Sequence, residues 1–383
     1  MMVYFDNAAT TFPKPYMVQK AMNEAMQKYC ANPGRGGHTM AYNTAEKIFE
    51  SRKKVASLLS VPSIENIIFT NNCTMSLNYV IKGLAQKGGH FICSSLEHNA
   101  VARPLEALKQ QNICTYDIAK VEKSSEETVK NFKKLINDNT IAIISTAASN
   151  VFGKIMPIKE LSQLAHQNGL LFVVDAAQTA GIIPLDCTND NIDFLCAPGH
   201  KGLYGPMGTG ILAVNCSKKL NTIIEGGTGN FSAILSQPKE YPERLESGTL
   251  NVPGILGLSA GVDFVMAKTV NKIYKHEQEI ITHIYDYLSE MKDVILYTNP
   301  KSSVESFVPL LSFNVKGLHS EETAEKLSAS GVAVRAGFHC AAFAHKSYGT
   351  MDSGTVRICP SAFTDIKDMN LLLNSIRKIA KDK

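Results

Sequence analysis

Two polar segments, each directly after an apolar run, carry the ionisable residues best suited to chemistry in this sequence. Asp175 ends one apolar run, where a buried acid is costly unless it has a partner. A pyridinium nitrogen would be such a partner, and a structural salt bridge is the alternative. Lys201 lies in the glycine-rich segment 198–206. It is either a solvated surface residue or a lysine with a lowered pKa that forms a Schiff base.

Two further polar segments could bind an anion and an aromatic ring. Residues 71–76 open a predicted helix, whose N-terminus offers free N–H groups and a positive dipole end to a phosphate. Thr74 in this segment could equally be an ordinary N-cap. His98 could stack on an aromatic ligand and exchange protons, or be a structural histidine. Each of these signals is weak when taken alone.

The apolar pattern predicts a scaffold that brings such segments together. Helical spacing over 44–59, with Asn43 or Thr44 as N-cap, and helices over 74–86 and 100–110 alternate with short apolar runs. The runs cover residues 67–70, 91–94, 141–145, 170–175, 193–197 and 210–214. This order predicts an α/β fold with a mostly parallel sheet covered by helices on both faces. Ligands bind at the carboxyl ends of the strands in such folds.

The pattern changes near residue 265, which indicates a second domain. A long charged helix over 268–291 is followed by apolar runs near 310–315 and 332–335. We therefore expect a large domain over residues 16–262. A smaller α+β domain would combine residues 1–15 with residues 263–383.

Composition narrows the classes of protein. The 383 residues are 44% hydrophobic and 19% charged, with a net charge of +4, which is ordinary for a globular enzyme. This charge gives no argument for nucleic acid or a membrane as partner. Nine cysteines, an odd number without a C-x-x-C pair, argue against a disulfide framework and a metal site. Without a visible secretory signal or a membrane-length apolar run, we expect a cytoplasmic protein with reduced thiols.

Each polar segment alone is typical of many proteins, but their order along the chain is typical of one family. Asp175, Gln178 and the His200-Lys201 pair resemble the cofactor signature of class V aminotransferases, a group of fold type I enzymes that use pyridoxal 5'-phosphate (PLP). The resemblance covers nearly the whole chain, including residues 4–11, 35–39 and 244–251. Residues 334–341, around Cys340, are similar to the SufS-like class of cysteine desulfurases and selenocysteine lyases. This resemblance implies a seven-stranded-type sheet in the large domain.

The resemblance also implies how PLP would be held. Lys201 would form the Schiff base and move a proton, and Asp175 would pair with the pyridine nitrogen. Gln178 would bond the ring hydroxyl, and His98 would stack on the ring and take part in catalysis. The phosphate would be bound by Thr74, the Met75 N–H, His200 and, from the other subunit of a homodimer, Thr249.

The same resemblance implies a route for sulfur. Arg357 and Asn150 would grip the carboxylate of L-cysteine or selenocysteine. The Cys340 thiolate would take the substrate sulfur as a persulfide, leave alanine, and pass the sulfur to an acceptor protein; an inert buried thiol is the alternative. Arg335 and His339 would favour the thiolate. The pocket would be lined by Ala8, His38 and Arg335.

Three positions depart from the family pattern, so the sequence does not decide which substrate the protein uses. Pro198 stands where a serine or threonine often binds phosphate, Gly202 is an extra glycine after the lysine, and Phe338 replaces a histidine. A cysteine desulfurase and a selenocysteine lyase share every residue named above. A class V aminotransferase or kynureninase-like lyase would not need Cys340. A non-catalytic binding scaffold with this fold would have no need of all six of the residues Lys201, Asp175, Gln178, His98, Cys340 and Arg357.

Overall fold

Seven strands form the central sheet of the computed structural model, which describes residues 2–34, 36–230 and 232–382. The strands are β2 (Ile67–Thr70), β3 (Gly89–Ser94), β4 (Cys114–Ala119), β5 (Thr140–Thr146), β6 (Leu171–Asp175), β7 (Phe194–Pro198) and β8 (Gly210–Val214). Their order is β2-β8-β7-β6-β5-β3-β4. All neighbours from β7 to β4 run parallel, and β8 is antiparallel to both β2 and β7. The predicted α/β class and mostly parallel sheet are confirmed.

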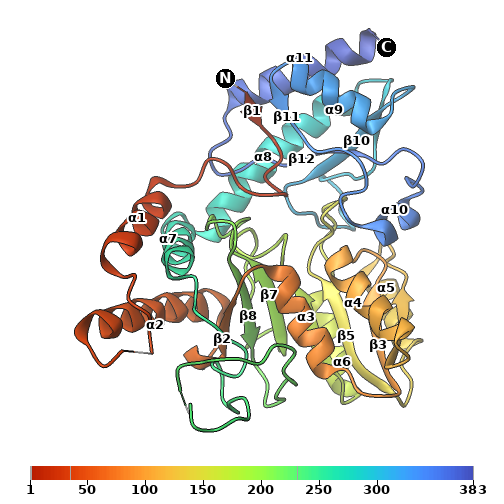
Figure 1. Cartoon of the computed structure of the whole chain (residues 1–383). Helices are drawn as coiled ribbons and strands as arrows, with labels where there is room; N and C mark the ends of the chain where they lie inside the picture. The colour runs from red at the N-terminus through yellow and green to blue at the C-terminus, as the bar shows by residue number, and fades with distance from the viewer. Residues whose placement is uncertain (1, 35, 231, 383) are drawn as a thin grey trace.

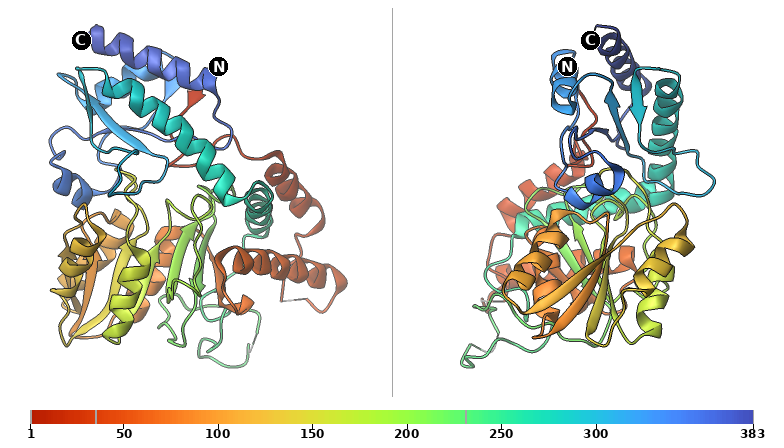
Figure 2. Two further views of the ribbon diagram at one scale, coloured as in Figure 1. Left: turned by 180° about the vertical axis from the view of Figure 1, so that it is seen from behind. Right: turned by 90° about the vertical axis from the view of Figure 1, so that its right-hand side faces the viewer.

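Helices cover both faces of this sheet because its strands bury residues on both sides. On β3, Phe91 and Cys93 pack against α3 (Cys73–Leu84) and α4 (Asn99–Gln110). Ile92, between them, joins the opposite core, to which α2 (Thr39–Leu59), α5 (Ser125–Lys133), α6 (Ile158–Gln167) and α7 (Val252–Lys268) contribute. α3 and α4 lie in front of the sheet in Figure 1. The yellow-green α6 lies in front of it in the left panel of Figure 2, which shows the molecule from behind.

The start of α2 differs from the prediction. His38, not Asn43 or Thr44, is the N-cap, and its Nδ1 accepts the Ala41 N–H at 3.3 Å. Thr44 lies inside the helix, where its hydroxyl donates to the Met40 carbonyl at 3.0 Å. Met40 and Tyr42 in the first turn of α2 are exposed although they are apolar, so the apolar periodicity of the buried face did not mark where the helix begins.

The C-terminal elements build separate small sheets. They are α8 (Val270–Ser289), β9 (Val294–Leu296), β10 (Leu311–Val315), α9 (Ser320–Ala329), β11 (Val332–Ala333), α10 (Ala342–Tyr348), β12 (Val356–Ile358) and α11 (Ile366–Lys381). β12, β10 and β9 form an antiparallel sheet with its own hydrophobic core. The N-terminal β1 (Val3–Tyr4) crosses to this region and pairs in parallel with β11 (Figure 1).

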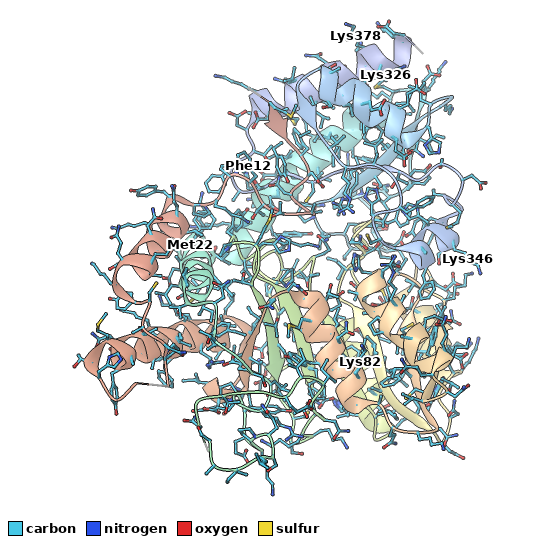
Figure 3. The ribbon with its side chains drawn as sticks, in the orientation of Figure 1. Phe12, Met22, Lys82, Lys326, Lys346 and Lys378 are labelled. Atoms are coloured by element: carbon cyan, nitrogen blue, oxygen red, sulfur yellow. The ribbon has the colours of Figure 1, made fainter. Side chains whose placement is uncertain are left out.

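The long connection from β1 to α2 is held in place by α1 (Tyr16–Lys28), which packs across α7. Gly257 makes the close approach possible, because a Cβ there would lie 2.7 Å from Met22 Cγ. Met22 is labelled in Figure 3 on the side of α1 that faces α7. In the part of the chain that the structure describes, no helix is long and apolar enough to cross a membrane.

Candidate active site

A pocket opens where β5, β6 and β7 end and α3 begins. This is the sheet edge at which ligands bind in open α/β folds. The pocket also contains Pro198, which offers no hydroxyl to a ligand. Seven of the residues predicted from the sequence line it together: Thr74, His98, Asn150, Asp175, Gln178, His200 and Lys201.

Asp175 is a buried acid whose side-chain oxygen accepts hydrogen bonds from neutral groups. Its exposed fraction is 2%. Its Oδ1 accepts the Ala177 N–H at 2.9 Å and the Cys73 thiol at 3.5 Å. No salt bridge joins it to any residue that the structure describes. Burial raises the pKa of Asp175, so a cation placed in the pocket would stabilise its charged form.

Lys201 follows β7 and reaches the same pocket. Burial, together with the positive charge of Arg357, lowers its pKa to about 8. At pH 7, about a tenth of this lysine is therefore a free amine able to attack a carbonyl carbon, far more than for a lysine with the ordinary pKa of 10.5. Beside it, the buried Nδ1 of His200 has no hydrogen-bond partner among the described residues.

The N-terminus of α3 faces the pocket, and one of its backbone N–H groups is already bonded to the N-cap residue. The side chain of Asn72 accepts the Met75 N–H at 2.9 Å. The predicted contact from the Met75 N–H to a phosphate therefore competes with this cap. Thr74, one residue earlier, is exposed and lines the pocket.

Gln178 connects the pocket to the N-terminal segment. Its Nε2 donates to the Ala8 carbonyl at 3.1 Å. Ala8 is buried and lines an adjoining cavity together with Gln178 and Lys201. Residues that are far apart in the sequence thus meet around the lysine.

His98 is neutral in this structure. Its Nδ1 caps α4 by accepting the Ala100 N–H at 3.0 Å, so the ring proton must be on Nε2. Burial and the nearby charges of Lys201 and Arg335 lower its pKa to about 4. The ring can therefore lie against a flat ligand without bringing a second positive charge next to the lysine.

Arg357, on β12, adjoins the pocket through Asn150, which lines it. Its exposed fraction is 1%. Nη2 lies 2.9 Å from Asp6 Oδ1, and Nη1 donates to the Asn150 carbonyl at 2.8 Å. Its Nε is buried without a partner among the described residues. A carboxylate could therefore be bound here.

Cys340 is exposed, which contradicts the alternative of an inert buried thiol. Its Sγ lies 4.0 Å from Arg335 Nη2, so the guanidinium stands where it would attract a thiolate. Its carbonyl accepts the Asn99 N–H at 2.7 Å, which places the cysteine turn beside His98.

His339 does not play the part expected of it. The ring is buried, and its Nε2 lies 2.9 Å from the Thr355 carbonyl. Burial, with the charge of Arg357 nearby, lowers its pKa to about 2. Since a neutral imidazole brings no positive charge to Cys340, the expectation that His339 favours the thiolate was wrong.

Arg335, Cys340 and Arg357 adjoin the pocket without lining it, whereas two other predicted residues lie away from it. His38 is exposed and caps α2, and Thr249 is exposed in the loop before α7. Arg35, in the same motif as His38, lies outside the described residues. Within a single chain, neither His38 nor Thr249 lines the pocket around Lys201.

Sequence reasoning missed Asp6, Cys73 and Thr355 as contributors to the site. Asp6 belongs to the N-terminal motif, and Cys73 lies in the segment assigned to phosphate, so both had a local signal. Thr355 had none, because its contact with His339 depends on the loop between α10 and β12.

Known proteins are similar to this chain over nearly its full length. The model of a family described as aminotransferase class-V matches residues 3–372. Probable cysteine desulfurases from Methanothermobacter thermautotrophicus and Pyrococcus abyssi are 30% and 31% identical to the chain. Each match covers 99% of this chain and 94% of the relative.

Two solved structures are also similar. The apo cysteine desulfurase from Thermococcus onnurineus NA1 has a TM-score of 0.91 at 30% identity, covering 100% of this chain and 95% of its own. The cysteine desulfurase CsdA from Escherichia coli, with an S-sulfonic acid, has a TM-score of 0.87 at 27% identity. That match covers 99% of this chain and 95% of CsdA.

The family implies PLP as cofactor, and the residues around the pocket fit this group. Asp175 offers a buried acid to the pyridine nitrogen, and the unpartnered Nδ1 of His200 is available to an oxygen acceptor when protonated. Lys201 has the lowered pKa that an amine needs to attach an aldehyde. The neutral ring of His98 can lie against an aromatic ring.

Proposed function

The chain belongs to the class V aminotransferase family, and we propose that within it this protein is a PLP-dependent cysteine desulfurase. It would convert L-cysteine to L-alanine and keep the sulfur on Cys340 as a persulfide. The observation that carries this proposal is the exposed Cys340 thiol beside Arg335, on a turn bonded to the residue that follows His98. A related aminotransferase would not need a thiol at this place.

Each residue of the pocket has a separate task in this proposal. PLP, when bound, supplies an electron sink for the carbanion at the substrate Cα. Lys201 attaches the cofactor and moves the proton at that carbon. Asp175 keeps the pyridine nitrogen protonated. Arg357 holds the substrate carboxylate, which orients the thiol of the substrate toward Cys340.

The sulfur transfer balances without an added oxidant. The Cys340 thiolate attacks the substrate sulfur, so one S–S bond forms while the Cβ–S bond breaks. The electron pair of that bond passes to the substrate carbon skeleton, which takes up protons and leaves as alanine. Arg335, at 4.0 Å from the Cys340 sulfur, compensates the negative charge before the attack.

Replacing Cys340 tests the proposal. We expect Cys340→Ala to keep the yellow absorbance of bound PLP and to lose persulfide and sulfide formation from L-cysteine. Cys30→Ala is the matched control, because Cys30 is exposed but lies away from the pocket, and its turnover should be unchanged. Full sulfide release by Cys340→Ala would favour a lyase that does not use this cysteine. The yields of alanine from L-cysteine and from selenocysteine show which substrate is preferred.

A second copy of this chain would complete the enzyme. Exposed apolar side chains gather on the N-terminal segment and on α1 and α2, including Phe12, Tyr16, Met40 and Tyr42. Phe12 is labelled in Figure 3. Exposed groups of this kind mark interfaces between proteins. A homodimer would bury them and bring the exposed His38 and Thr249 to the partner's pocket. A monomeric mass with full activity, measured by sedimentation, would contradict this.

The exposure of Cys340 also supports transfer of the persulfide to an acceptor protein. The nine cysteines are free thiols, which is consistent with a reducing, cytoplasmic location.

A further inference from the structure

The turn that carries Cys340 has an unfavourable backbone conformation. His339 and Cys340 have φ angles of 49° and 56°. Non-glycine residues are rarely found in this left-handed region, and two in succession need support from their surroundings. The turn should therefore depend on the hydrogen bonds that hold it from outside.

Two of these bonds come from the large sheet region. The Asn99 N–H donates to the Cys340 carbonyl at 2.7 Å, and the Asn150 Nδ2 donates to the His339 carbonyl at 2.8 Å. A third, within the C-terminal region, joins the His339 ring to the Thr355 carbonyl. Both peptide carbonyls next to the Cys340 thiol are thus fixed from the large sheet region, one by the backbone of Asn99 and one by the side chain of Asn150.

The orientation of the Asn150 amide follows from chemistry. A carbonyl oxygen accepts but cannot donate, so the Asn150 NH2 group must face the His339 carbonyl. This leaves its second N–H for another acceptor, and its Oδ1 is buried without a partner among the described residues. Only 8% of Asn150 is exposed, and it lines the pocket.

Asn150 also contacts the carboxylate side of the site. Its backbone carbonyl accepts Arg357 Nη1 at 2.8 Å. A substrate carboxylate beside Arg357 would therefore lie near the amide that holds the cysteine turn. One NH2 group can donate to two acceptors at once.

We propose that Asn150 is a positioning residue that links the carboxylate end of the substrate pocket to the Cys340 turn. One N–H holds the His339 carbonyl in the left-handed turn, and the other receives the carboxylate. A bound carboxylate would restrict rotation of the amide and thereby keep its other N–H directed at the His339 carbonyl. The identity of the carboxylate rests on the proposed function, whereas the link between Asn150 and the turn does not.

Hydrogen–deuterium exchange in the PLP-loaded protein tests this link. We expect Asn150→Asp and Asn150→Ala to speed exchange of the peptide over residues 337–341 about threefold to tenfold, which corresponds to the loss of one hydrogen bond. Saturating L-alanine, which carries the substrate's α-carboxylate, should slow exchange of this peptide in the unaltered protein. Two variants are used because aspartate adds a charge and alanine does not.

Asn168→Asp is the matched control. Asn168 Nδ2 also donates to a backbone carbonyl, that of Leu164 at 2.8 Å, but it lies at the end of α6. Exchange of residues 337–341 should be unchanged in this variant. The absorbance of bound PLP checks that each variant is folded and loaded.

Kinetics separates positioning from carboxylate binding. If Asn150 positions Cys340, the variants lower kcat for persulfide formation as well as raising KM. Unchanged exchange in both Asn150 variants, with a higher KM alone, would overturn the proposal and leave Asn150 as a carboxylate ligand. The exchange result is independent of whether L-cysteine is the substrate, so it is distinguishable from a failure of the proposed function.

Discussion

Removing the acid beside Arg357 should weaken the fold and strengthen carboxylate binding at the same time. The side chain of Asp6 is 20% exposed, whereas that of Arg357 is 1% exposed, and the two lie 2.9 Å apart. Arg357 is therefore a buried charge whose salt bridge within the chain is made with a residue from the N-terminal segment. Asp6→Ala removes this partner, and Asp6→Asn keeps an oxygen acceptor but removes the charge.

The size of the effect follows from the burial of the pair. Breaking a buried pair by removing one partner costs about 3–5 kcal/mol. Because Asp6 is partly exposed, we expect about 3 kcal/mol for Asp6→Ala. Asp6→Asn should cost about 1–2 kcal/mol, the difference between a charged and a neutral hydrogen bond. For 383 residues, an unfolding entropy of about 2.1 cal/mol/K per residue gives a change of about 4 °C in Tm for alanine and about 2 °C for asparagine.

Thermal unfolding of the PLP-loaded enzyme, with and without L-alanine, measures both effects. In Asp6→Asn the guanidinium has lost its anionic partner and should bind the carboxylate of L-alanine more tightly, so the ligand should raise Tm more in this variant than in the unaltered protein. Equal Tm values for the unaltered protein and Asp6→Ala would refute the structural part of the reasoning. A smaller ligand effect in Asp6→Asn would refute the electrostatic part.

Two further outcomes depend on pH. Burial lowers the pKa of Lys201 from 10.5 to about 8, so the rate at which cofactor-free enzyme takes up PLP should rise with pH around a midpoint near 8; a midpoint near 10 would contradict this. Burial raises the pKa of Glu277 from 4.5 to about 8. Between these two pH values the folded protein keeps a proton that the unfolded chain releases. The stability that this protonated group contributes is therefore fully present below pH 4.5 and is lost as the pH rises to 8. Glu277→Gln, which can still accept the Tyr204 hydroxyl, should reduce this loss in denaturant titrations at pH 5 and pH 8, and an unchanged loss would contradict the assignment.

Much of the large sheet could be predicted because its strands are buried on both faces. β5, β6, β7 and β8 are short apolar runs in the sequence, and their order alone indicates a mostly parallel sheet. β4 was not predicted, since its middle residues are partly or fully exposed and include Asp117. β4 is the edge strand of the sheet, and only its two end residues are buried, so it leaves no apolar run in the sequence.

Site residues could be predicted where they stand at or shortly after the end of a predicted strand. Asp175 ends β6, and Lys201 comes shortly after β7, so local sequence places both at the pocket. The surroundings of Cys340 were harder, because His339 is adjacent in sequence yet turns into the core. The pairing of Asp6 with Arg357 depends on the crossing of β1 to β11, which local patterns do not reveal.

The crossing of β1 also sets the order in which the enzyme can be completed during synthesis. Val3 pairs with Val332, and Asp6 meets Arg357. A ribosome makes the N-terminal residues first, at about 5–20 residues per second, so they wait roughly 20–70 seconds for their partners. The large sheet can form on the nascent chain in that time. The Arg357 side of the pocket, however, exists only after residue 357 has left the ribosome, by which time Cys340 has already been made.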